Sequence, residues 1–457
     1  MNRLLAGHLF WPLTERLRRR DTMRRLGQLR QTKNASAAEL HRLRQSKLQR
    51  LVQLAAQHCP FYTARFLRSG FDPCDPRLDV EDLHRLPILT RDEISEQLEA
   101  MTWHGCPRGG PQPYSTGGSG GKALKFYFDR SRAAADQAAR WRARGWWDVR
   151  PGDPEILLWG APIELKANDR LRQWRDGLLN QRILNAFEMT EQTMGSYVQT
   201  IREQRPMCLY GYASSLALLA RYALDNGIPA GGLGSARLRA VFVTGEVLLD
   251  TDRTVIEQAF GVPAAIEYGC RDGGLLAHAC PAGTLHVPEE NVIVELLDEG
   301  DRPVGPGGIG YVTVTHLEAF AMPIIRYRLG DLARAADQSR HCSCGSTLAS
   351  IAEVRGRLTD HIVRREGKHL RRMHALSLIY VLREAEGLRQ FRIVQPDLDR
   401  LDIEVVTDDR YGPQTEQDIR DGLRRRMGEQ VDIRIHRLDR IEPTASGKHA
   451  CVISHVQ

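Results

Sequence analysis

The order of hydrophobic and polar positions divides the chain into three parts. In the first 58 residues, leucines recur at three- and four-residue spacings among Arg, Gln and Lys, a pattern that predicts helices. From about Glu155, short β-rich runs alternate with helical stretches. The predicted strands are 156–159, 238–243, 292–297 and 311–315, and the predicted helices are 214–224 and 252–260. This alternation indicates a large α/β domain.

A smaller set of elements follows from about residue 356. The predicted elements are a helix at 374–386, strands at 390–394 and 401–406, a helix at 414–427 and a strand at 431–436. We therefore expect a basic helical N-terminal arm (1–58), a large domain (59–355) and a small C-terminal α+β domain (356–457).

Composition and charge narrow the class of protein. The 457 residues are 42% hydrophobic and 26% charged, which is typical of a soluble globular protein. The net charge is +7, yet residues 1–50 alone carry +10, so the remaining chain sums to about −3. Because the basicity belongs to one arm and no nucleic-acid motif is present, we expect no nucleic-acid partner.

The arm has three interpretations. It combines arginines with an apolar set formed by Leu4, Leu5, Leu9, Phe10 and Trp11. The first interpretation is that the arm lies on an anionic membrane surface, and the second is that it docks on a partner. The third is that it folds along the large domain as a solvated helical arm.

Targeting features and cysteines bear on location. No stretch approaches about 18 uninterrupted apolar residues, so no membrane-spanning helix is predicted. The apolar run at 4–13 is short and lacks a small-residue cleavage site, so we expect no secretory signal. Nine cysteines, an odd number, favour a reducing compartment. We expect a cytoplasmic protein, with peripheral contact of residues 1–50 to the inner face of the membrane as a hypothesis.

The segment from Ser115 to Lys122 has the chemistry of a phosphate cradle. Its hydroxyls, glycine backbone N–H groups and lysine are supplied by Ser115, Thr116, Gly117, Gly118, Ser119, Gly120, Gly121 and Lys122. It is not the Walker pattern, which requires Gly at 116 and Ser or Thr at 123. A flexible Gly/Ser hairpin is the alternative. A second glycine run, 305–310, precedes a predicted strand and contains a proline, so we interpret it as a turn.

Four later segments follow the glycine loop in a distinctive order. They are Tyr-Gly-Cys-Arg-Asp at 268–272, Tyr-Arg-Leu-Gly-Asp at 327–331, Gly-Arg-Leu-Thr-Asp at 356–360 and Thr-Ala-Ser-Gly-Lys at 444–448. Together with the loop, they resemble the adenylate-forming superfamily. With Cys59-Pro-Phe-Tyr62 and Leu86-Pro-Ile-Leu-Thr90 upstream, the spacing is similar to the branch that contains phenylacetate-CoA ligase, CapK and coenzyme F390 synthetase. The resemblance covers residues 45–455.

The resemblance implies a fold and a reaction. The fold is a large multi-layer α/β domain followed by a small mobile C-terminal α+β domain. The reaction is attack of a carboxylate on the α-phosphate of ATP, which gives an acyl-AMP and pyrophosphate, followed by displacement of AMP by a thiol or amine. The implied cofactors are ATP, Mg²⁺ and CoA. An adenylyltransferase that leaves AMP on its acceptor and a non-catalytic nucleotide-binding scaffold are the alternatives.

The resemblance also implies roles for individual residues on the nucleotide. The glycine loop would hold the phosphates, and Asp272, where the family usually has Glu, would hold Mg²⁺. Asp331 would accept hydrogen bonds from the ribose hydroxyls, although it could instead cap a turn. The adenine side would be formed by Gly245, Glu246 and Tyr268, with Gly269 and Arg271 in the same segment as Tyr268. A core tyrosine is the alternative for Tyr268.

Two residues of the C-terminal region complete the implied machinery. Arg357 would contact the nucleotide, and Lys448 would reach the α-phosphate during adenylation. Thr359 occupies the position where the family's hinge typically has Asp, so transfer to CoA is less firmly implied than adenylation.

Three cysteines and a histidine form a candidate metal site. Cys280 and His286 lie on one predicted loop, and Cys342 and Cys344 lie on another. Two ligands from each of two loops suit a tetrahedral structural zinc site, which leaves no position open for chemistry. Rival ligands are Cys270, His278 and His341, and the alternative is a set of free core thiols.

The acid and the acceptor are less well defined. We expect the acyl pocket between the loop at 160–162 and the segment at 210–214, lined by Trp159, Tyr210 and Tyr212. These aromatic residues suit an aromatic or medium apolar acid, or they belong to the core. The acceptor would be CoA, a carrier-protein phosphopantetheine or an amine.

Overall fold

The computed structural model describes residues 2–456 except for 33–34, 116–123, 160–168, 187–188, 249, 338–341, 358–360, 367–368, 376–377, 380, 383–384, 440 and 442–451. The chain divides into two compact units. The first comprises Met1–Ser115 and Lys125–Gly356, and the second contains Arg357–Gln457. Several predicted features lie outside the described residues: Thr116–Lys122, the loop at 160–162, His341, Thr359 and Lys448.

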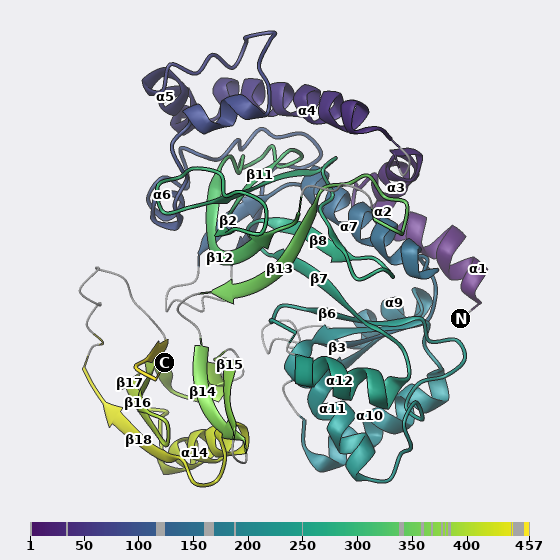
Figure 1. Ribbon diagram of the computed structural model, residues 1–457, viewed down its shortest axis with the longest axis vertical. Helices are drawn as coiled ribbons and strands as arrows, with labels where there is room; N and C mark the ends of the chain where they lie inside the picture. Colours follow the sequence, from purple (N-terminus) through teal and green to yellow (C-terminus); the bar gives the residue numbers. More distant parts are fainter. Residues whose placement is uncertain are drawn as a thin grey trace. The chain divides into compact units, whose positions relative to one another are not determined.

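An eleven-stranded sheet forms the centre of the first unit (Figure 1). Its order is β10-β11-β12-β13-β9-β8-β7-β6-β5-β3-β4. The strands are β3 (Glu155–Trp159), β4 (Gln181–Asn185), β5 (Cys208–Tyr212), β6 (Ala240–Thr244), β7 (Ala264–Cys270), β8 (Gly274–Ala279), β9 (Leu285–His286), β10 (Val292–Leu297), β11 (Ile309–His316), β12 (Tyr327–Ala335) and β13 (Ser350–Arg357). A separate antiparallel pair is formed by β1 (Gln112–Ser115) and β2 (Lys125–Phe128).

The sheet is parallel from β4 to β7 and antiparallel from β7 to β9. Strands β5 and β6 are buried along their whole lengths, as expected for parallel strands covered on both faces. The alternating helices are α7 (Arg130–Arg144), α9 (Asp169–Leu178), α10 (Glu191–Gln204), α11 (Ala213–Asp225) and α12 (Asp250–Phe260). Helices α10 to α12 gather on one side of these strands (Figure 1), and a core of Leu209, Val241, Leu216 and Ile256 fills the space between. The prediction of an α/β fold is confirmed.

Helices at the N-terminus belong to the first unit. They are α1 (Arg3–Leu5), a π-helical turn (Ala6–Phe10), α2 (Trp11–Leu17), α3 (Thr22–Gln31), α4 (Ala37–His58) and α5 (Pro60–Arg68), and α6 (Arg91–Glu96) follows later in the chain. A capping box between Ser36 and Glu39 starts α4. None of the helices described is long and apolar enough to cross a membrane.

Ion pairs hold α3 and α4 against two loops of the large sheet, the loop between β9 and β10 and the loop after β11. Arg25 and Lys47 both pair with Glu318, at 2.8 and 2.6 Å, and Arg44 pairs with Glu289 at 2.8 Å. Leu40, also on α4, is buried. From α3 onward the arm is therefore folded along the large domain, and part of its positive charge is neutralised there.

The second unit has its own core. The hairpin of β14 (His361–Glu366) and β15 (His369–His374) accompanies a four-stranded sheet ordered β18-β17-β16-β19. These strands are β16 (Leu388–Asp397), β17 (Arg400–Thr407), β18 (Asp432–Arg437) and β19 (Val452–Ser454). Helix α14 (Pro413–Met427) buries Ile419, Leu423 and Met427 at helical spacing.

One predicted boundary in this unit is wrong. His374, the expected first residue of a helix, is the last residue of β15. Strand β15 carries only Leu370 and Met373 as apolar residues, so its alternation is too weak to be recognised in the sequence. The run 305–310, by contrast, contains the predicted turn, at 306–307, and its last two residues begin β11.

Candidate nucleotide site and metal centre

Strands β5, β6 and β7 are parallel neighbours, so their carboxyl ends lie at one edge of the sheet. Three predicted segments are found there: 210–214, 245–246 and 268–272. This is the edge at which α/β sheets place ligands. Gly245 follows β6 with φ +75°, and a Cβ there would lie 3.0 Å from the Tyr212 ring. Only glycine combines that backbone angle with so close a ring. Trp159, at the end of β3, stacks on Tyr212 with ring centroids 4.3 Å apart and 15° between the planes. Trp159 and Tyr212 therefore form a stacked aromatic pair, and Gly245, the residue before Glu246, lies against the Tyr212 ring.

Two tyrosine–aspartate pairs cross between the segments 268–272 and 327–331. The Tyr268 hydroxyl at the end of β7 donates to Asp331 of β12 at 2.9 Å. In the opposite sense, the Tyr327 hydroxyl of β12 donates to Asp272 after β7 at 2.8 Å. Two segments that are far apart in sequence are thus joined reciprocally, and both carboxylates expected to bind nucleotide or metal are oriented by these pairs.

The environments of the two pairs differ. Asp272 is only 3% exposed, whereas Asp331 is half-buried. Burial, followed by the charge of Asp272, raises the pKa of Tyr327 well above its ordinary value. The Tyr327 hydroxyl therefore stays protonated and remains a donor to the Asp272 carboxylate. Burial also raises the pKa of the neighbouring Cys270 well above its ordinary value, so this cysteine remains an unreactive thiol.

Arg271 connects this loop to the strand that leads into the glycine loop. Its guanidinium donates to the Ser115 carbonyl at 3.4 Å and lies 5.3 Å from the centre of the Tyr114 ring. On the other side, Arg132 of α7 donates to the Arg271 carbonyl at 2.8 Å. The residue expected to bind nucleotide therefore also fixes the end of β1 relative to β7.

Tyr210 has the contacts of a core residue. Its hydroxyl donates to Glu267 at 2.9 Å, and Glu267 in turn pairs with Arg140 at 2.9 Å. Burial alone would raise the pKa of Glu267, but Arg140 and Arg144 outweigh it and lower the pKa to about 2. Of the three aromatic residues predicted to line the acyl pocket, Tyr210 thus supports a buried ion pair, while Trp159 and Tyr212 remain together at the sheet edge.

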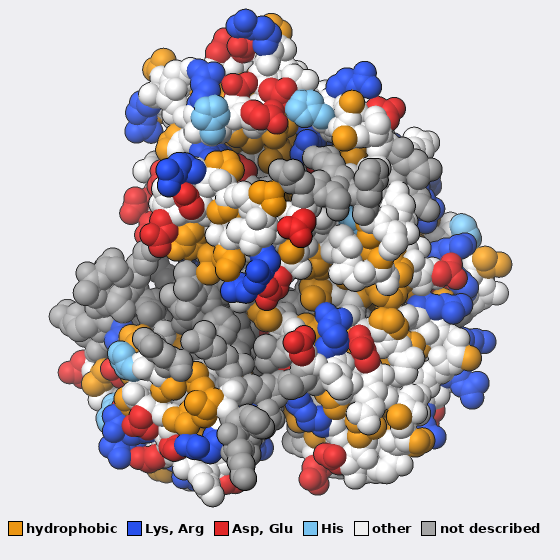
Figure 2. Space-filling model, viewed as in Figure 1, with side chains coloured by type: hydrophobic (Ala, Val, Ile, Leu, Met, Phe, Trp, Pro, Cys, Tyr) orange, Lys and Arg blue, Asp and Glu red, His pale blue; other side chains and the backbone are white. Residues whose placement is uncertain are grey.

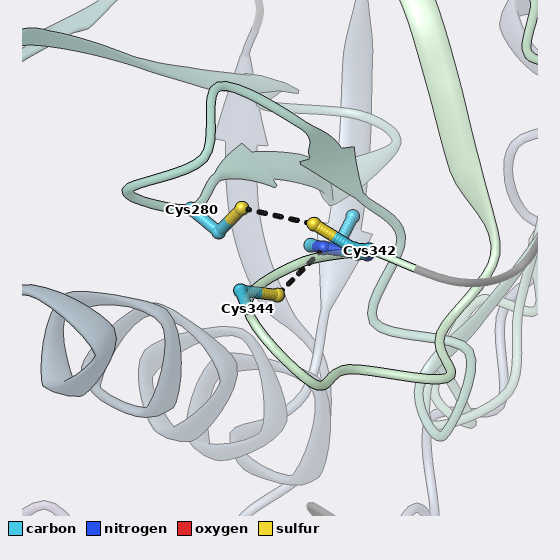
Figure 3. Close-up of side chains that lie close together, drawn as sticks. Cys280, Cys342 and Cys344 are labelled. Carbon is cyan, nitrogen blue, oxygen red and sulfur yellow. Dashed lines mark hydrogen bonds between the residues drawn. The ribbon is translucent and has the colours of Figure 1, made fainter.

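The four predicted zinc ligands converge in the first unit (Figure 3). The ligand atoms of Cys280, His286, Cys342 and Cys344 all lie within 4.8 Å of one another. The sulfurs of Cys280 and Cys342 are 3.6 Å apart, and the Cys344 sulfur lies 3.3 Å from Nε2 of His286. This is the donor set and spacing that a tetrahedral zinc ion requires.

The surroundings of His286 suit a metal ligand. Its Nδ1 lies 3.3 Å from the Leu348 carbonyl, and because a carbonyl only accepts, Nδ1 carries the proton. The opposite nitrogen, Nε2, is then left with its lone pair directed at the cysteines. The rival ligand His278 lies elsewhere: its Nδ1 faces the Ala279 carbonyl at 2.9 Å, and burial lowers its pKa to about 4.

Position in the sheet shows what the cluster connects. His286 of β9 is opposite Ser350 of β13, and Cys342 and Cys344 lie in the loop that leads into β13. Strand β13 ends at Arg357, whose side chain is not among those described. The cluster therefore fixes the strand that runs to the boundary between the two units.

Some contributors were missed by reasoning from the sequence. Tyr327 opens a recognised motif but received no role, because nothing in the chain shows that it faces Asp272. Arg140 and Arg132 are charged positions on a helix with no local signal of their partners. Glu267 did carry a signal in the sequence, because a single acidic residue in an apolar strand requires a buried partner.

A large mixed sheet followed by a smaller C-terminal α+β unit is the architecture of adenylate-forming enzymes of known structure. In the second unit, residues 362–455 match the model of a family described as the CapK C-terminal domain. The chain is 22% identical to protein CapK of Staphylococcus aureus, over 92% of this chain and 90% of that protein. It is 23% identical to phenylacetate-coenzyme A ligase of Thermus thermophilus, over 71% of this chain and 72% of that protein.

A solved structure supports the fold over nearly the whole chain. 2-Hydroxyisobutyryl-CoA ligase, in complex with 2-HIB-AMP and CoA in the thioesterification state, aligns with a TM-score of 0.64. The identity is 20%, with 93% of this chain and 91% of that chain covered. The resemblance to the adenylate-forming superfamily, in its CapK and phenylacetate-CoA ligase branch, is confirmed, as is the enzyme class of adenylate-forming ligase.

Proposed function

We propose that the protein activates a carboxylic acid with ATP as an acyl-AMP, releases pyrophosphate, and transfers the acyl group to a thiol. The observation that supports this most directly is the crossed pairing of Tyr268 with Asp331 and of Tyr327 with Asp272. It orients two carboxylates from separate segments at the sheet edge, where one nucleotide can meet both.

Asp331 is the proposed ribose contact. A carboxylate accepts hydrogen bonds through two oxygens, and Tyr268 donates to one of them, Oδ2. The pair therefore gives the carboxylate a fixed orientation toward a diol. Thr244 pairs with Glu267, so Tyr268 lies at the same sheet edge as Gly245 and Glu246, the proposed adenine side.

Asp272 is the proposed magnesium ligand. Tyr327 donates to its Oδ2, which orients the carboxylate while leaving lone pairs for a cation. A single carboxylate suits Mg²⁺, which takes most of its remaining ligands from phosphate oxygens and water. A bound Mg²⁺ would neutralise the negative charge that develops on the phosphates.

The remaining roles are proposed from the sequence. The loop 115–122 holds the β- and γ-phosphates, Arg357 contacts the nucleotide, and Lys448 stabilises the charge on the α-phosphate. Mixed-anhydride formation proceeds by attack of the acid's carboxylate oxygen on the α-phosphorus, with the bond to the pyrophosphate oxygen breaking. Thiol attack on the acyl carbon then forms the thioester and releases AMP.

CoA is the proposed acceptor. The phenylacetate and 2-hydroxyisobutyrate ligases that this chain is similar to carry CoA in their names, and the second was solved with it. A carrier-protein thiol or an amine would attack the acyl carbon of the same acyl-AMP and release AMP. For the acid, the stacked Trp159 and Tyr212 favour an aromatic or medium apolar chain.

Acid-dependent exchange of labelled pyrophosphate into ATP tests the proposal. A panel of aromatic, fatty and hydroxy acids is screened with the full-length protein, and at least one acid should support exchange. Lys448→Ala should abolish that exchange, whereas Arg434→Ala, which removes an exposed cation from β18 of the same unit, should not. Unchanged exchange in Lys448→Ala would contradict the role assigned to this lysine.

The products distinguish the alternatives. Free AMP with an acylated thiol supports the ligase, and AMP retained on the acceptor indicates an adenylyltransferase instead. ATP binding without exchange for any acid would indicate a nucleotide-binding scaffold.

A second proposal concerns the metal centre. We propose that Cys280, His286, Cys342 and Cys344 hold a structural zinc ion, supported by the convergence of their four ligand atoms. With four protein ligands, the ion has no position for substrate, so its contribution is to the stability of the β9–β13 region.

A further inference from the structure

The outer face of α1 and α2 carries an exposed row of leucines. Leu5, Leu9, Leu13 and Leu17 follow one another at four-residue intervals, which places them along one face, and Leu4 lies beside them. All five are between 46% and 76% exposed. They make up five of the twelve large hydrophobic side chains exposed in the described part of the chain. We call Leu5, Leu9, Leu13 and Leu17 the leucine face.

The opposite side of the same helices is fixed to the first unit. Trp11 is buried, with its ring edge-on to Trp141 of α7 at a centroid distance of 5.2 Å. Gly7, in the π-helical turn, approaches Gly152 so closely that a Cβ on either residue would clash with the other segment's backbone. The leucine face is therefore presented by a rigid support, because the helices that carry it cannot turn it inward.

Basic residues accompany the leucines at the end of α2. Arg16 lies within the row, three residues after Leu13, and is followed by Arg18, Arg19 and Arg20. Arg18 pairs with Glu15 at 3.6 Å, but no ion pair joins Arg16 or Arg19 to an acid among the residues that the structure describes. At the edge of the molecule where α1 lies, Figure 2 shows hydrophobic side chains next to Lys and Arg.

A neighbouring helix adds an aromatic residue. Burial, Arg20 and Arg175 of α9 lower the pKa of Arg18, which places the end of α9 close to the end of α2. The residue before Arg175 is Trp174, which is 65% exposed. Leucines beside arginines are the composition of a helix that lies in the plane of a bilayer surface, and exposed tryptophans are common at the membrane interface.

We propose that the leucine face, together with Arg16 and Arg19, docks the protein on an anionic lipid surface. The face extends over about 18 Å, which is long enough for the helix to lie in the headgroup region. A second copy of the chain fits poorly, because a symmetric contact would bring the same arginines against each other. The proposed interaction is peripheral and would place the enzyme at a membrane surface. It does not depend on the reaction proposed above.

Vesicle flotation with the full-length protein tests this proposal. Vesicles of phosphatidylcholine with about one-third phosphatidylglycerol are compared with phosphatidylcholine alone, and binding is expected only to the anionic vesicles. The variant Leu5→Gln/Leu9→Gln/Leu13→Gln/Leu17→Gln should weaken binding roughly a hundredfold. The matched control Leu67→Gln/Leu218→Gln/Leu370→Gln/Leu438→Gln, which changes four leucines exposed elsewhere, should bind like the unmodified protein.

A charge variant separates the two contributions. Arg16→Gln/Arg19→Gln should reduce binding about tenfold and make the remainder less sensitive to salt. If the leucine variant shows a lowered unfolding temperature, Leu13→Gln/Leu17→Gln replaces it with the same expected direction.

The outcomes that overturn the proposal are distinct. Equal binding to both vesicle types, or full binding by the leucine variant, refutes docking through this face. Absence of vesicle binding by the unmodified protein also refutes it, and loss of self-association in the leucine variant would then identify a second copy as the occupant. Pyrophosphate exchange measured without vesicles reports the proposed reaction separately, so failure of one proposal is distinguishable from failure of the other.

Discussion

Removing the Tyr327 hydroxyl is the most informative single change in the first unit. In Tyr327→Phe, Asp272 loses a donor at 2.8 Å while remaining almost wholly buried. A hydrogen bond to a buried charged group contributes about 1.5–3 kcal/mol, because water cannot replace the lost donor. We therefore expect the free energy of unfolding of the first unit to fall by about 1.5–3 kcal/mol.

Tyr268→Phe provides an internal comparison. It removes the equivalent hydrogen bond to Asp331, but that carboxylate is half-buried, so water can take the place of the hydroxyl. The expected loss is about 0.5–1 kcal/mol. Tyr222→Phe is the matched control, because the Tyr222 hydroxyl makes no hydrogen bond to any described residue.

Urea unfolding followed by tryptophan fluorescence suits this measurement. All seven tryptophans of the chain lie between Trp11 and Trp174, so the signal reports the first unit and not the second. The same variants are assayed for the Michaelis constant of Mg-ATP in pyrophosphate exchange, which should rise most in Tyr327→Phe. A stability loss in Tyr327→Phe no larger than that in Tyr222→Phe would refute the reasoning.

Three further predictions concern the nucleotide, the metal and pH. Asp331→Asn should raise the Michaelis constant for ATP about tenfold or more with little change in unfolding free energy; an unchanged constant in exchange kinetics would remove the ribose role. Purified protein should contain about one equivalent of zinc by elemental analysis, and chelation should lower the unfolding temperature; metal-free protein of equal stability would exclude the zinc site. Burial lowers the pKa of His278 to about 4, below its unfolded value, so the unfolded state binds a proton first and stability should fall as pH decreases from about 6.5 to 4. That contribution is on the order of 3 kcal/mol, and a stability profile for His278→Gln with the same slope in this range as the unmodified protein would show that another group is responsible.

Much of the fold was predictable because buried strands and helices leave clear apolar patterns in the sequence. The apolar runs at 156–159 and 292–297 coincide with β3 and β10 to within a residue at each end. Helix α14 begins one residue before the predicted boundary at 414 and ends at the predicted Met427. Strands β14 and β15 were missed because arginine and histidine dominate them, so their pairing rather than their composition defines them.

The candidate site was predictable in composition but not in arrangement. The resemblance to the adenylate-forming superfamily identified Asp272 and Asp331 as candidates, and spacing and donor chemistry identified the four metal ligands. No local pattern shows that Tyr327 reaches Asp272 across the sheet, or that Tyr210 turns its hydroxyl to Glu267. Such contacts depend on strand neighbours that are distant in sequence, which single-chain periodicity does not encode.

The cysteine–histidine cluster has a consequence for how the chain reaches its fold. Cys280 and Cys342 are 62 residues apart, and the intervening chain forms β9, β10, β11 and β12, while β13, which pairs with β9, follows Cys342. An ion that joined these thiols early would close that segment into a loop and remove about 4 kcal/mol of chain entropy from the unfolded ensemble. The block β10–β12 could then assemble as an enclosed antiparallel meander while the parallel strands pair independently. Metal supply during synthesis would thus set the order in which the two halves of the sheet are completed.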